Sequence, residues 1–458
     1  MHPSAIQPVW SGRPRPLPLT LLLILVLILS TPAFTQDKPI ALRGGKLLTI
    51  THGAIDNGVI VMQGGKITAV GAASAVNIPS SAQVIDATGM TIYPGLIDSE
   101  TQLGLTEISA ENMTNDLVEL SDEIMPHMHT AEAFHAESAL IPVARMNGIT
   151  NAVVAPESGD TLPGQDCFIQ LAGANSTEML LIRDNAMPLN FTGDERRNKG
   201  GFEKRKFPST RMGLAAQLRQ AFIDAADYQA KRADYERKKA DAAQSAQNKD
   251  KDKEKDKKPE PQAPKRDLKL EALIPYLEGK KTVLLAAESP SDLQTAVSLA
   301  NEFKLKFVLN HIAHSQPVLD YVASLKVPVI VGPIYEAPKE DERYDAVYSL
   351  PAQLYKRGVK IVFASYSAHN VRNLPDQAGF ATAFGLPYDE ALKAVTLNAA
   401  EIWGVADQLG SLDVGKTANV VVANGDPLDV KTDVKQVFIQ GREVPMTSRQ
   451  TRLRDEYK

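Results

Sequence analysis

The middle of the chain alternates short apolar strands with helical stretches, and this pattern restricts the possible fold more than any other feature. Runs rich in β-branched residues cover residues 91–97, 149–155, 282–286, 306–309, 327–331 and 360–365. Helical stretches such as residues 291–303 and 388–403 separate several of them. Apolar strands that alternate with amphipathic helices are typical of a parallel sheet covered by helices. Residues 93–404 are therefore predicted to form an α/β barrel of the TIM (β/α)8 type, with a doubly wound open sheet as the alternative.

The two ends of the chain follow a different pattern. Residues 40–84 and 418–439 contain short β-rich segments, separated by turn sequences such as Asn57-Gly58. Because such segments lie on both sides of the barrel pattern, residues 36–92 and 405–458 are predicted to build one small composite β-sandwich.

A charged insertion interrupts the barrel pattern at about residues 229–268. Residues 225–243 can form a helix, but residues 249–258 are nearly an alternating run of lysine and acidic side chains. Such a run has no apolar face to bury, so a flexible, solvated insert is predicted. The alternative interpretation is an arm that docks a partner.

The first 35 residues have the pattern of a signal peptide. Arg13 and Arg15 precede an apolar run at residues 17–29, and small residues follow at 30–33. The apolar run is shorter than the roughly 20 residues that a membrane span needs. We therefore expect cleavage near residue 36, no stable membrane span afterwards, and a secreted or periplasmic location. An uncleaved anchor is the alternative.

Composition excludes some classes of partner and site. The formal net charge is −5 over 458 residues, which does not favour nucleic acid or an anionic membrane as the main partner. Cys167 is the only cysteine, so an intramolecular disulfide and a cysteine-rich zinc site are both impossible.

Three passages have the motifs of a known family. They are Tyr-Pro-Gly-Leu-Ile-Asp at 93–98, Gly-Ser-Leu-Asp-Val-Gly-Lys at 410–416, and Asn-Gly-Asp-Pro-Leu at 424–428. With them, the region from about residue 40 to residue 444 resembles the amidohydrolase superfamily, particularly its imidazolonepropionase-like branch. The resemblance implies a distorted TIM barrel, a composite sandwich, and hydrolysis of C–N bonds in cyclic amides or dipeptides. It also implies zinc or another divalent metal at the barrel mouth, where the metal activates water.

The positions where the family has metal ligands hold other residues here. The first-strand pair of histidines is replaced by Glu100 and Gln102. The family has another histidine after the strand predicted at 306–309, where Asn310 and then His311 stand here. Strand alternation predicts that Asn310 and His311 point to opposite faces. No carboxylate stands in Ser365-Tyr366-Ser367, where the family has an aspartate. We therefore predict that a metal does not bind in the usual way.

The candidate site residues lie at the ends of the barrel strands, where TIM barrels gather functional groups. The catalytic candidates are Glu100, Glu288 as a general base, and His311. The weak metal candidates are Glu100, His311, His127 and His129, the last two with Glu132 and His135 close by. The substrate-binding candidates are His314, His369, Asn370 and Arg372, with hydrogen-bonded structural loops as the alternative interpretation.

The sequence thus predicts an exported amidohydrolase-type hydrolase of C–N bonds whose small-molecule substrate is unknown. The alternative is an inactive pseudoenzyme that binds a ligand or serves as partner subunit of an intact amidohydrolase. The fold alone does not decide between these two functions, because function belongs to the site. A homo- or hetero-oligomer with a related amidohydrolase is a possible assembly.

Overall fold

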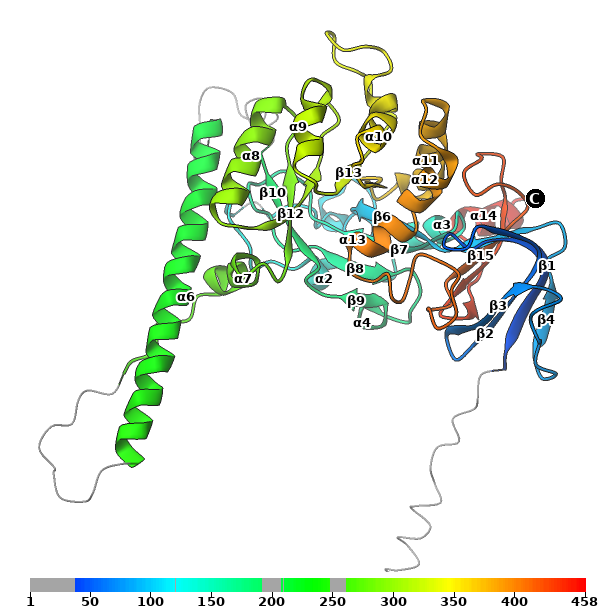
Figure 1. The fold of residues 1–458 in the computed structure, drawn as a ribbon, viewed down its shortest axis with the longest axis horizontal. Helices are drawn as coiled ribbons and strands as arrows, with labels where there is room; N and C mark the ends of the chain where they lie inside the picture. The colour runs from blue at the N-terminus through cyan, green and yellow to red at the C-terminus, as the bar shows by residue number, and fades with distance from the viewer. Residues whose placement is uncertain (1–37, 120, 192–206, 209, 248–260) are drawn as a thin grey trace, which may run out of the picture. The chain divides into compact units, whose positions relative to one another are not determined.

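The computed structural model describes residues 38–119, 121–191, 207–208, 210–247 and 261–458, and their strands lie in three sheets (Figure 1). The expected signal peptide and the lysine-rich run at 249–258 lie outside the described residues. The bounds of the helices and strands below refer to the described part of the chain.

One eight-stranded sheet combines strands from both ends of the chain. Its strands are β1 (Ile40–Leu48), β2 (Ala54–Gln63), β3 (Lys66–Ala72), β4 (Gln83–Asp86), β5 (Thr91–Pro94), β15 (Val420–Ala423), β16 (Val434–Ile439) and β17 (Arg442–Glu443). The order is β17-β16-β15-β5-β1-β2-β3, with β4 paired to β1. The antiparallel pair of β15 and β5 joins the two ends. Strands from the two ends of the chain therefore share one sheet.

A five-stranded parallel sheet forms the later part of the middle region. It consists of β10 (Ala186–Asn190), β11 (Thr282–Ala286), β12 (Lys306–Asn310), β13 (Val329–Val331) and β14 (Ile361–Phe363), in that order. The register aligns Asn190, Ala286 and Asn310, so the carboxyl ends of three neighbouring strands meet at one edge. The predicted parallel sheet is therefore present.

A second sheet of the middle region has the order β6-β7-β8-β9, from β6 (Leu96–Thr101), β7 (Ile149–Val154), β8 (Cys167–Gln170) and β9 (Leu180–Ile182). The single strand predicted at 91–97 is divided between β5 and β6, which belong to different sheets. Gly95 lies at the division, where a Cβ atom would stand 2.1 Å from Thr150 Oγ1. Glycine therefore allows the close approach at which the chain passes from one sheet to the other.

Helices cover the parallel strands. They are α8 (Pro290–Glu302), α9 (Leu319–Ser324), α10 (Ala346–Lys356), α11 (Leu374–Ala383), α12 (Tyr388–Ala394) and α13 (Leu397–Ile402), and the 3-10 turns η2 (Gln316–Val318) and η3 (Asn370–Asn373) lie between them. Contacts of α8 with β11 and of α10 to α13 with β14 place them against the sheet. Ser289 caps α8 by accepting from Asp292 N, and Pro290 occupies its first turn.

The remaining helices lie outside this layer. They are η1 (Asn112–Thr114), α2 (Thr130–Ala133), α3 (Leu140–Arg145), α4 (Ser176–Met179), α6 (Arg211–Gln247), α7 (Leu268–Leu277) and α14 (Arg449–Glu456). The helix predicted at 225–243 is the later part of α6, which packs on α7 and α8. Among the described helices, the 37-residue α6 included, none combines the length and apolar character that a membrane crossing requires.

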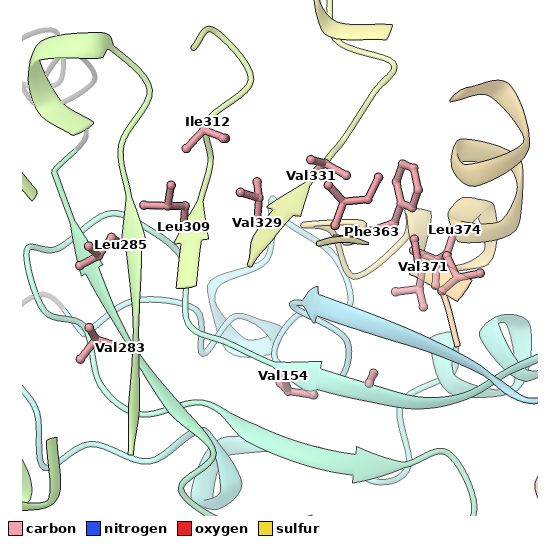
Figure 2. Close-up of a cluster of buried hydrophobic side chains, with 14 of the residues drawn as sticks. Val154, Val283, Leu285, Leu309, Ile312, Val329, Val331, Phe363, Val371 and Leu374 are labelled. Atoms are coloured by element: carbon pink, nitrogen blue, oxygen red, sulfur yellow. The ribbon is translucent and has the colours of Figure 1, made fainter. Parts of the chain in front are cut away.

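Alternate side chains of the parallel strands enter two different apolar clusters. Val283 and Leu285 belong to the larger cluster, which also includes Val329, Val331 and Phe363 (Figure 2). A smaller cluster takes one residue from each of β6, β7, β8, β10, β11, β12, β13 and β14: Ile97, Val153, Phe168, Ala186, Leu284, Val308, Ile330 and Val362. Strands buried on both faces in this way explain the unbroken apolar runs in the sequence.

Candidate functional site

Four side chains from three strand ends meet in one polar cluster, here termed the mouth cluster: Glu100, Asn310, His311 and Tyr366. Glu100 lies in β6, Asn310 ends β12, and Tyr366 follows β14. Asn310 Nδ2 donates to Glu100 Oε2 at 2.5 Å, and His311 Nε2 lies 3.5 Å from Glu100 Oε1. The Tyr366 hydroxyl donates to Asn310 Oδ1. Both oxygens of Glu100 thus have a donor within the cluster.

Two members of the mouth cluster have unusual backbone conformations. His311 has φ 52° and Tyr366 has φ 49°, and their rings lie 4.2 Å apart between centroids at an angle of 39°. Bulky residues in this left-handed region are strained, and such strain occurs preferentially at functional sites. Here Tyr366 N donates to the Glu100 carbonyl at 3.0 Å and His311 N donates to Asn310 Oδ1 at 3.0 Å. These hydrogen bonds hold both rings in place.

The positive φ of His311 overturns one expectation from the sequence. Strand alternation predicted that Asn310 and His311 would point to opposite faces. In the structure both reach Glu100, because β12 ends at Asn310 and the left-handed turn at His311 redirects its side chain. Two catalytic candidates, Glu100 and His311, are therefore brought together.

The charges around His311 favour its imidazolium form. Burial opposes that form, but the hydrogen bond and charge of Glu100, together with the charges of Glu288 and Glu336, raise the pKa of His311 above its ordinary value. Burial also raises the pKa of Glu336, against the effect of His314 and His311. Glu288, the third catalytic candidate, thus acts electrostatically on the mouth cluster.

Two aspartic acids are buried close to Glu100, and burial disfavours the charged form of each. Burial raises the pKa of Asp98 to about 7 and that of Asp166 to about 8, and the charge of Glu100 adds to both shifts. Asp98 Oδ1 accepts from Ser365 N at 3.0 Å, and Asp166 Oδ1 accepts from Ala186 N at 2.5 Å. The Oδ2 atom of each is buried and accepts no hydrogen bond from a described residue.

A pocket of about 780 Å³ lies beyond the carboxyl ends of β11 and β12. Glu288 and His314 line it, together with residues of the 339–353 segment. His314 Nδ1 lies 2.8 Å from Glu342 Oε2. The pocket thus combines one catalytic candidate with one substrate-binding candidate, and it can accept a small molecule.

The other predicted substrate-binding residues lie on the surface. His369 is exposed, and its Nε2 lies 3.0 Å from the Glu107 carbonyl oxygen. Asn370 begins η3 and donates its backbone N–H to Ser367 Oγ. Arg372 is exposed in η3. These three residues are not part of the mouth cluster or among those lining the 780 Å³ pocket.

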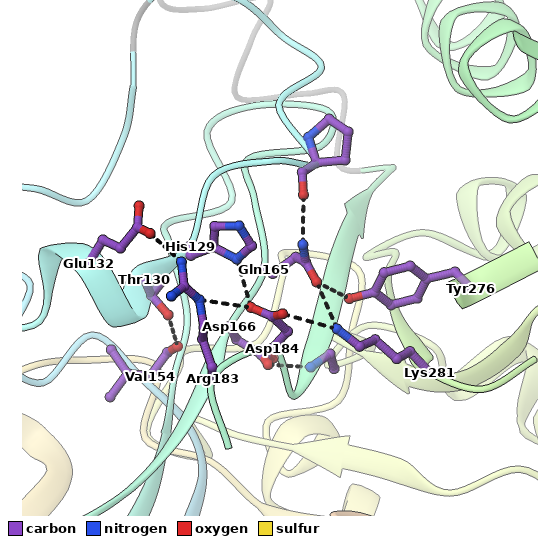
Figure 3. A network of polar contacts seen from close by, with 12 residues as sticks. His129, Thr130, Glu132, Val154, Gln165, Asp166, Arg183, Asp184, Tyr276 and Lys281 are labelled. Atoms are coloured by element: carbon purple, nitrogen blue, oxygen red, sulfur yellow. Dashed lines mark hydrogen bonds and ion pairs between the residues drawn. The ribbon is translucent and has the colours of Figure 1, made fainter. Parts of the chain in front are cut away.

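The histidine segment at 127–135 contacts acids of its own neighbourhood (Figure 3). His129 Nδ1 lies 2.7 Å from Asp184 Oδ1, and Asp184 also pairs with Lys281 at 3.3 Å. Glu132 pairs with Arg183. His135 pairs with Asp116 at 2.9 Å, and His127 is half-buried. Within the part of the chain that the structure describes, His127 and His129 are therefore not gathered with other side chains into a metal site.

The side chains of the mouth do not fit a zinc site as they are arranged. A zinc ion takes three or four converging donors with available lone pairs. Within the described ranges, no group of three or more histidine, cysteine, aspartate or glutamate side chains is placed to hold a metal. Glu100 directs its oxygens at an amide N–H and an imidazole instead.

Sequence reasoning missed the roles of Asn310, Tyr366 and Glu336. Asn310 and Tyr366 occupy positions at which only metal ligands were sought, so their mutual hydrogen bond was not anticipated. The available signal was positional, because each of the three follows or ends a parallel strand.

Comparisons with known proteins agree with this fold. Residues 288–444 match the family described as "Amidohydrolase family". The chain is 25% identical over 401 residues to amidohydrolase tasK of Hapsidospora irregularis, a match that covers 84% of this chain. The chain spans 39% of the length of that relative.

Solved structures extend the likeness across most of the chain. An amidohydrolase from Thermotoga maritima MSB8 is 27% identical with a TM-score of 0.76, covering 90% of this chain and 100% of that one. Two more distant structures show the fold alone. A prolidase complexed with n-methylphosphonate-L-proline has 17% identity, a TM-score of 0.52 and coverages of 89% and 99%. Molinate hydrolase has 15% identity, a TM-score of 0.53 and coverages of 90% and 96%. Residues 288–444 thus match the amidohydrolase family, and nine-tenths of the chain shares the fold of a solved amidohydrolase.

Proposed function

We propose that the chain is an amidohydrolase-type hydrolase that cleaves C–N bonds of small cyclic amides or dipeptides at the mouth cluster. The observation that carries the proposal is the Glu100–His311 pair, held by strained backbone at the carboxyl ends of the parallel strands. The acid Glu288 and a small-molecule pocket lie beside it. The solved amidohydrolase that is 27% identical to this chain supports a hydrolase of the amidohydrolase type.

The structural part of the proposal is a distorted (β/α)8-type barrel beside a composite β-sandwich of residues 36–92 and 405–458. We also propose that the chain belongs to the imidazolonepropionase-like branch of the amidohydrolase superfamily. Support comes from the eight strands that each contribute one residue to a shared apolar cluster. The hydrogen bond from Tyr366 N to the Glu100 carbonyl joins the last of these strands to the first. Both features are typical of a closed barrel filled by its own side chains.

In the proposed mechanism, Glu288 takes a proton from water as the water oxygen attacks the carbonyl carbon of the substrate. The imidazolium of His311 donates to the developing oxyanion and then gives its proton to the leaving nitrogen. Glu100 keeps His311 protonated before each cycle, and a proton passes from Glu288 back to His311 through solvent afterwards. General acid–base catalysis of this kind contributes roughly 10²–10⁴-fold to a rate.

Hydrolysis of a panel of cyclic amides and dipeptides tests the proposal, with metal content measured in the same samples. His311→Gln and Glu288→Gln are each expected to lower kcat/KM by about 100-fold or more, and a chelator is expected to have no effect. The matched control is His52→Gln, which removes an exposed histidine that contacts Asp413. Stoichiometric metal together with activity that a chelator abolishes would refute the metal-free route.

A second candidate is an inactive binding subunit. Two observations favour it. Both Glu100 oxygens already contact donors within the chain, and the described side chains of the mouth cluster do not fit a zinc site. The tasK relative, in which the matching region is 39% of a longer chain, is consistent with a subunit that works beside further protein. Binding of the same compounds in calorimetry without turnover would favour this candidate over the first.

Export is also part of the proposal, through a signal peptide at residues 1–35. N-terminal sequencing of protein recovered from the periplasm or medium is expected to begin near residue 36. Recovery of the protein only in the cytoplasm, with residues 1–35 intact, would contradict export.

A further inference from the structure

An open groove on the outer face of α11 combines aromatic rings with carboxylates. Its volume is about 570 Å³, and its walls include Tyr335, Phe380 and Tyr388. The Tyr335 and Phe380 rings lie 5.8 Å apart, and these side chains are 50% and 39% exposed. Val430 at the groove edge is 78% exposed. A contiguous exposed patch of aromatic and aliphatic side chains is typical of a protein interaction surface.

The groove is formed by the close approach of a loop to α11. A Cβ atom on Gly379 would lie 2.1 Å from the Leu428 carbonyl oxygen, so only glycine allows the loop at 426–430 to pack on this helix. The Tyr388 hydroxyl donates to Asp426 Oδ1 at 2.9 Å, which fixes the opposite wall. The groove is therefore a built feature of the fold.

The groove carries negative charge that the described residues do not balance. Asp376, Asp426 and Asp429 line it. Asp376 makes no hydrogen bond or ion pair with any residue in the described ranges, and burial raises its pKa. A partly desolvated carboxylate beside aromatic faces favours a cationic side chain, because the ring faces and the carboxylate both attract positive charge.

The C-terminal helix α14 has the complementary character. Residues 449–458 carry four basic and two acidic side chains, hence a formal charge of +2. Arg449, Arg452 and Leu453 lie on one face of α14 by their i, i+3 and i+4 spacing, and Leu453 is 41% exposed. No residue of this eight-residue helix is buried, although a capping box fixes its start. Isolated helices this short are marginal in water, so α14 gains stability by packing on a surface.

We propose that the groove receives α14 of a second copy of this chain. Arg449 and Arg452 pair with Asp376 and the neighbouring carboxylates, while Leu453 packs against the rings of Tyr335 and Phe380. The exchange is reciprocal in a two-fold dimer, because each copy carries both the groove and the helix. This proposal does not depend on the proposed hydrolase activity.

Sedimentation of the purified full-length protein over a range of concentrations tests the dimer. Asp376→Lys, and separately the double variant Arg449→Glu/Arg452→Glu, are each expected to weaken dimerisation by at least about tenfold, as expected for reversing one partner of a charge pair. The matched control is Glu236→Lys on α6, which makes the same charge change at an exposed site and is expected to keep the dimer. Circular dichroism of each variant verifies folding.

Two results would overturn the proposal. The first is a wild-type protein that sediments as a monomer at every concentration up to about 100 μM, since a weaker association falls short of a specific interface. The second is a dimer that the groove and helix variants leave unchanged, which would place the interface elsewhere on the molecule.

Discussion

Replacing Asp166 with asparagine should remove the contribution of one proton to the pH dependence of stability. Asp166 is fully buried, and its Oδ2 accepts no hydrogen bond from a described residue. Burial, then the charge of Glu100, raises its pKa from 3.8 to about 8, although the hydrogen bond from Ala186 N partly opposes this. Between these two values the folded protein holds a proton that the unfolded chain has released. The free energy of unfolding therefore falls as the pH rises through this window.

The size of the effect follows from proton linkage. One proton bound only by the folded state changes the free energy of unfolding by about 1.4 kcal/mol per pH unit, so Asp166 accounts for on the order of 4 kcal/mol between about pH 5 and pH 8. Asparagine cannot ionise, and its Oδ1 can still accept from Ala186 N, which Asp166 Oδ1 does at 2.5 Å. Asp98, with a pKa of about 7, also makes the free energy of unfolding fall as the pH rises, and the variant retains this contribution.

Urea unfolding of the wild type and Asp166→Asn at several pH values measures this difference. The variant is expected to lose about 1.4 kcal/mol less per pH unit than the wild type within the window. Asp433→Asn, at an exposed aspartate that pairs with Lys435, serves as the control and should keep the wild-type slope. Equal slopes for Asp166→Asn and the wild type would refute the argument that Asp166 is protonated in the folded protein.

Three further predictions concern the mouth and the groove. Tyr366→Phe removes one of the two donors to Asn310 Oδ1, and His311 N still donates to that oxygen. The free energy of unfolding, measured by chemical denaturation, should fall by about 1 kcal/mol. Glu100→Gln removes the group that most raises the pKa of His311, so NMR titration should show this pKa falling; an unchanged value would mean that the pair does not form. Gly379→Ala places a methyl group 2.1 Å from a loop carbonyl and should destabilise the protein by about 1–3 kcal/mol, whereas a neutral effect would show that the loop is free to move.

The parallel strands were predictable from the sequence because their burial on both faces leaves a direct signal. The apolar run predicted at 282–286 coincides with β11, and those at 306–309 and 360–365 lie at β12 and β14. The division of the run at 91–97 was not predictable from apolar content, since Ile92 and Ile97 are both fully buried but belong to different sheets. It depends on the tertiary contact between Gly95 and Thr150.

The candidate site was predictable only in part. Glu100 and His311 were found because they stand at strand ends where the family has ligands, and the structure brings them within 3.5 Å. The alternation argument failed at His311 because it assumes that the strand continues, whereas a left-handed residue ends it. His369 and Arg372 were predicted to bind substrate because they follow the last strand in sequence. Both side chains are exposed, at the start of η3 and within it, and no local sequence pattern indicates this.

The positions of the three carboxyl groups determine where charge resides at the mouth. Asp98, Glu100 and Asp166 interact electrostatically, and carboxylates in such proximity do not all ionise together. Glu100 alone has a donor at each oxygen, from Asn310 and His311, whereas Asp98 and Asp166 each leave one buried oxygen without a donor from a described residue. Burial therefore opposes a negative charge on Asp98 and Asp166, whereas the Glu100 carboxylate lies against the donors of Asn310 and His311. Because its counter-charge is an imidazolium within the same chain, the mouth is neutralised by its own side chains, and the positive group that a substrate carbonyl would meet there is His311.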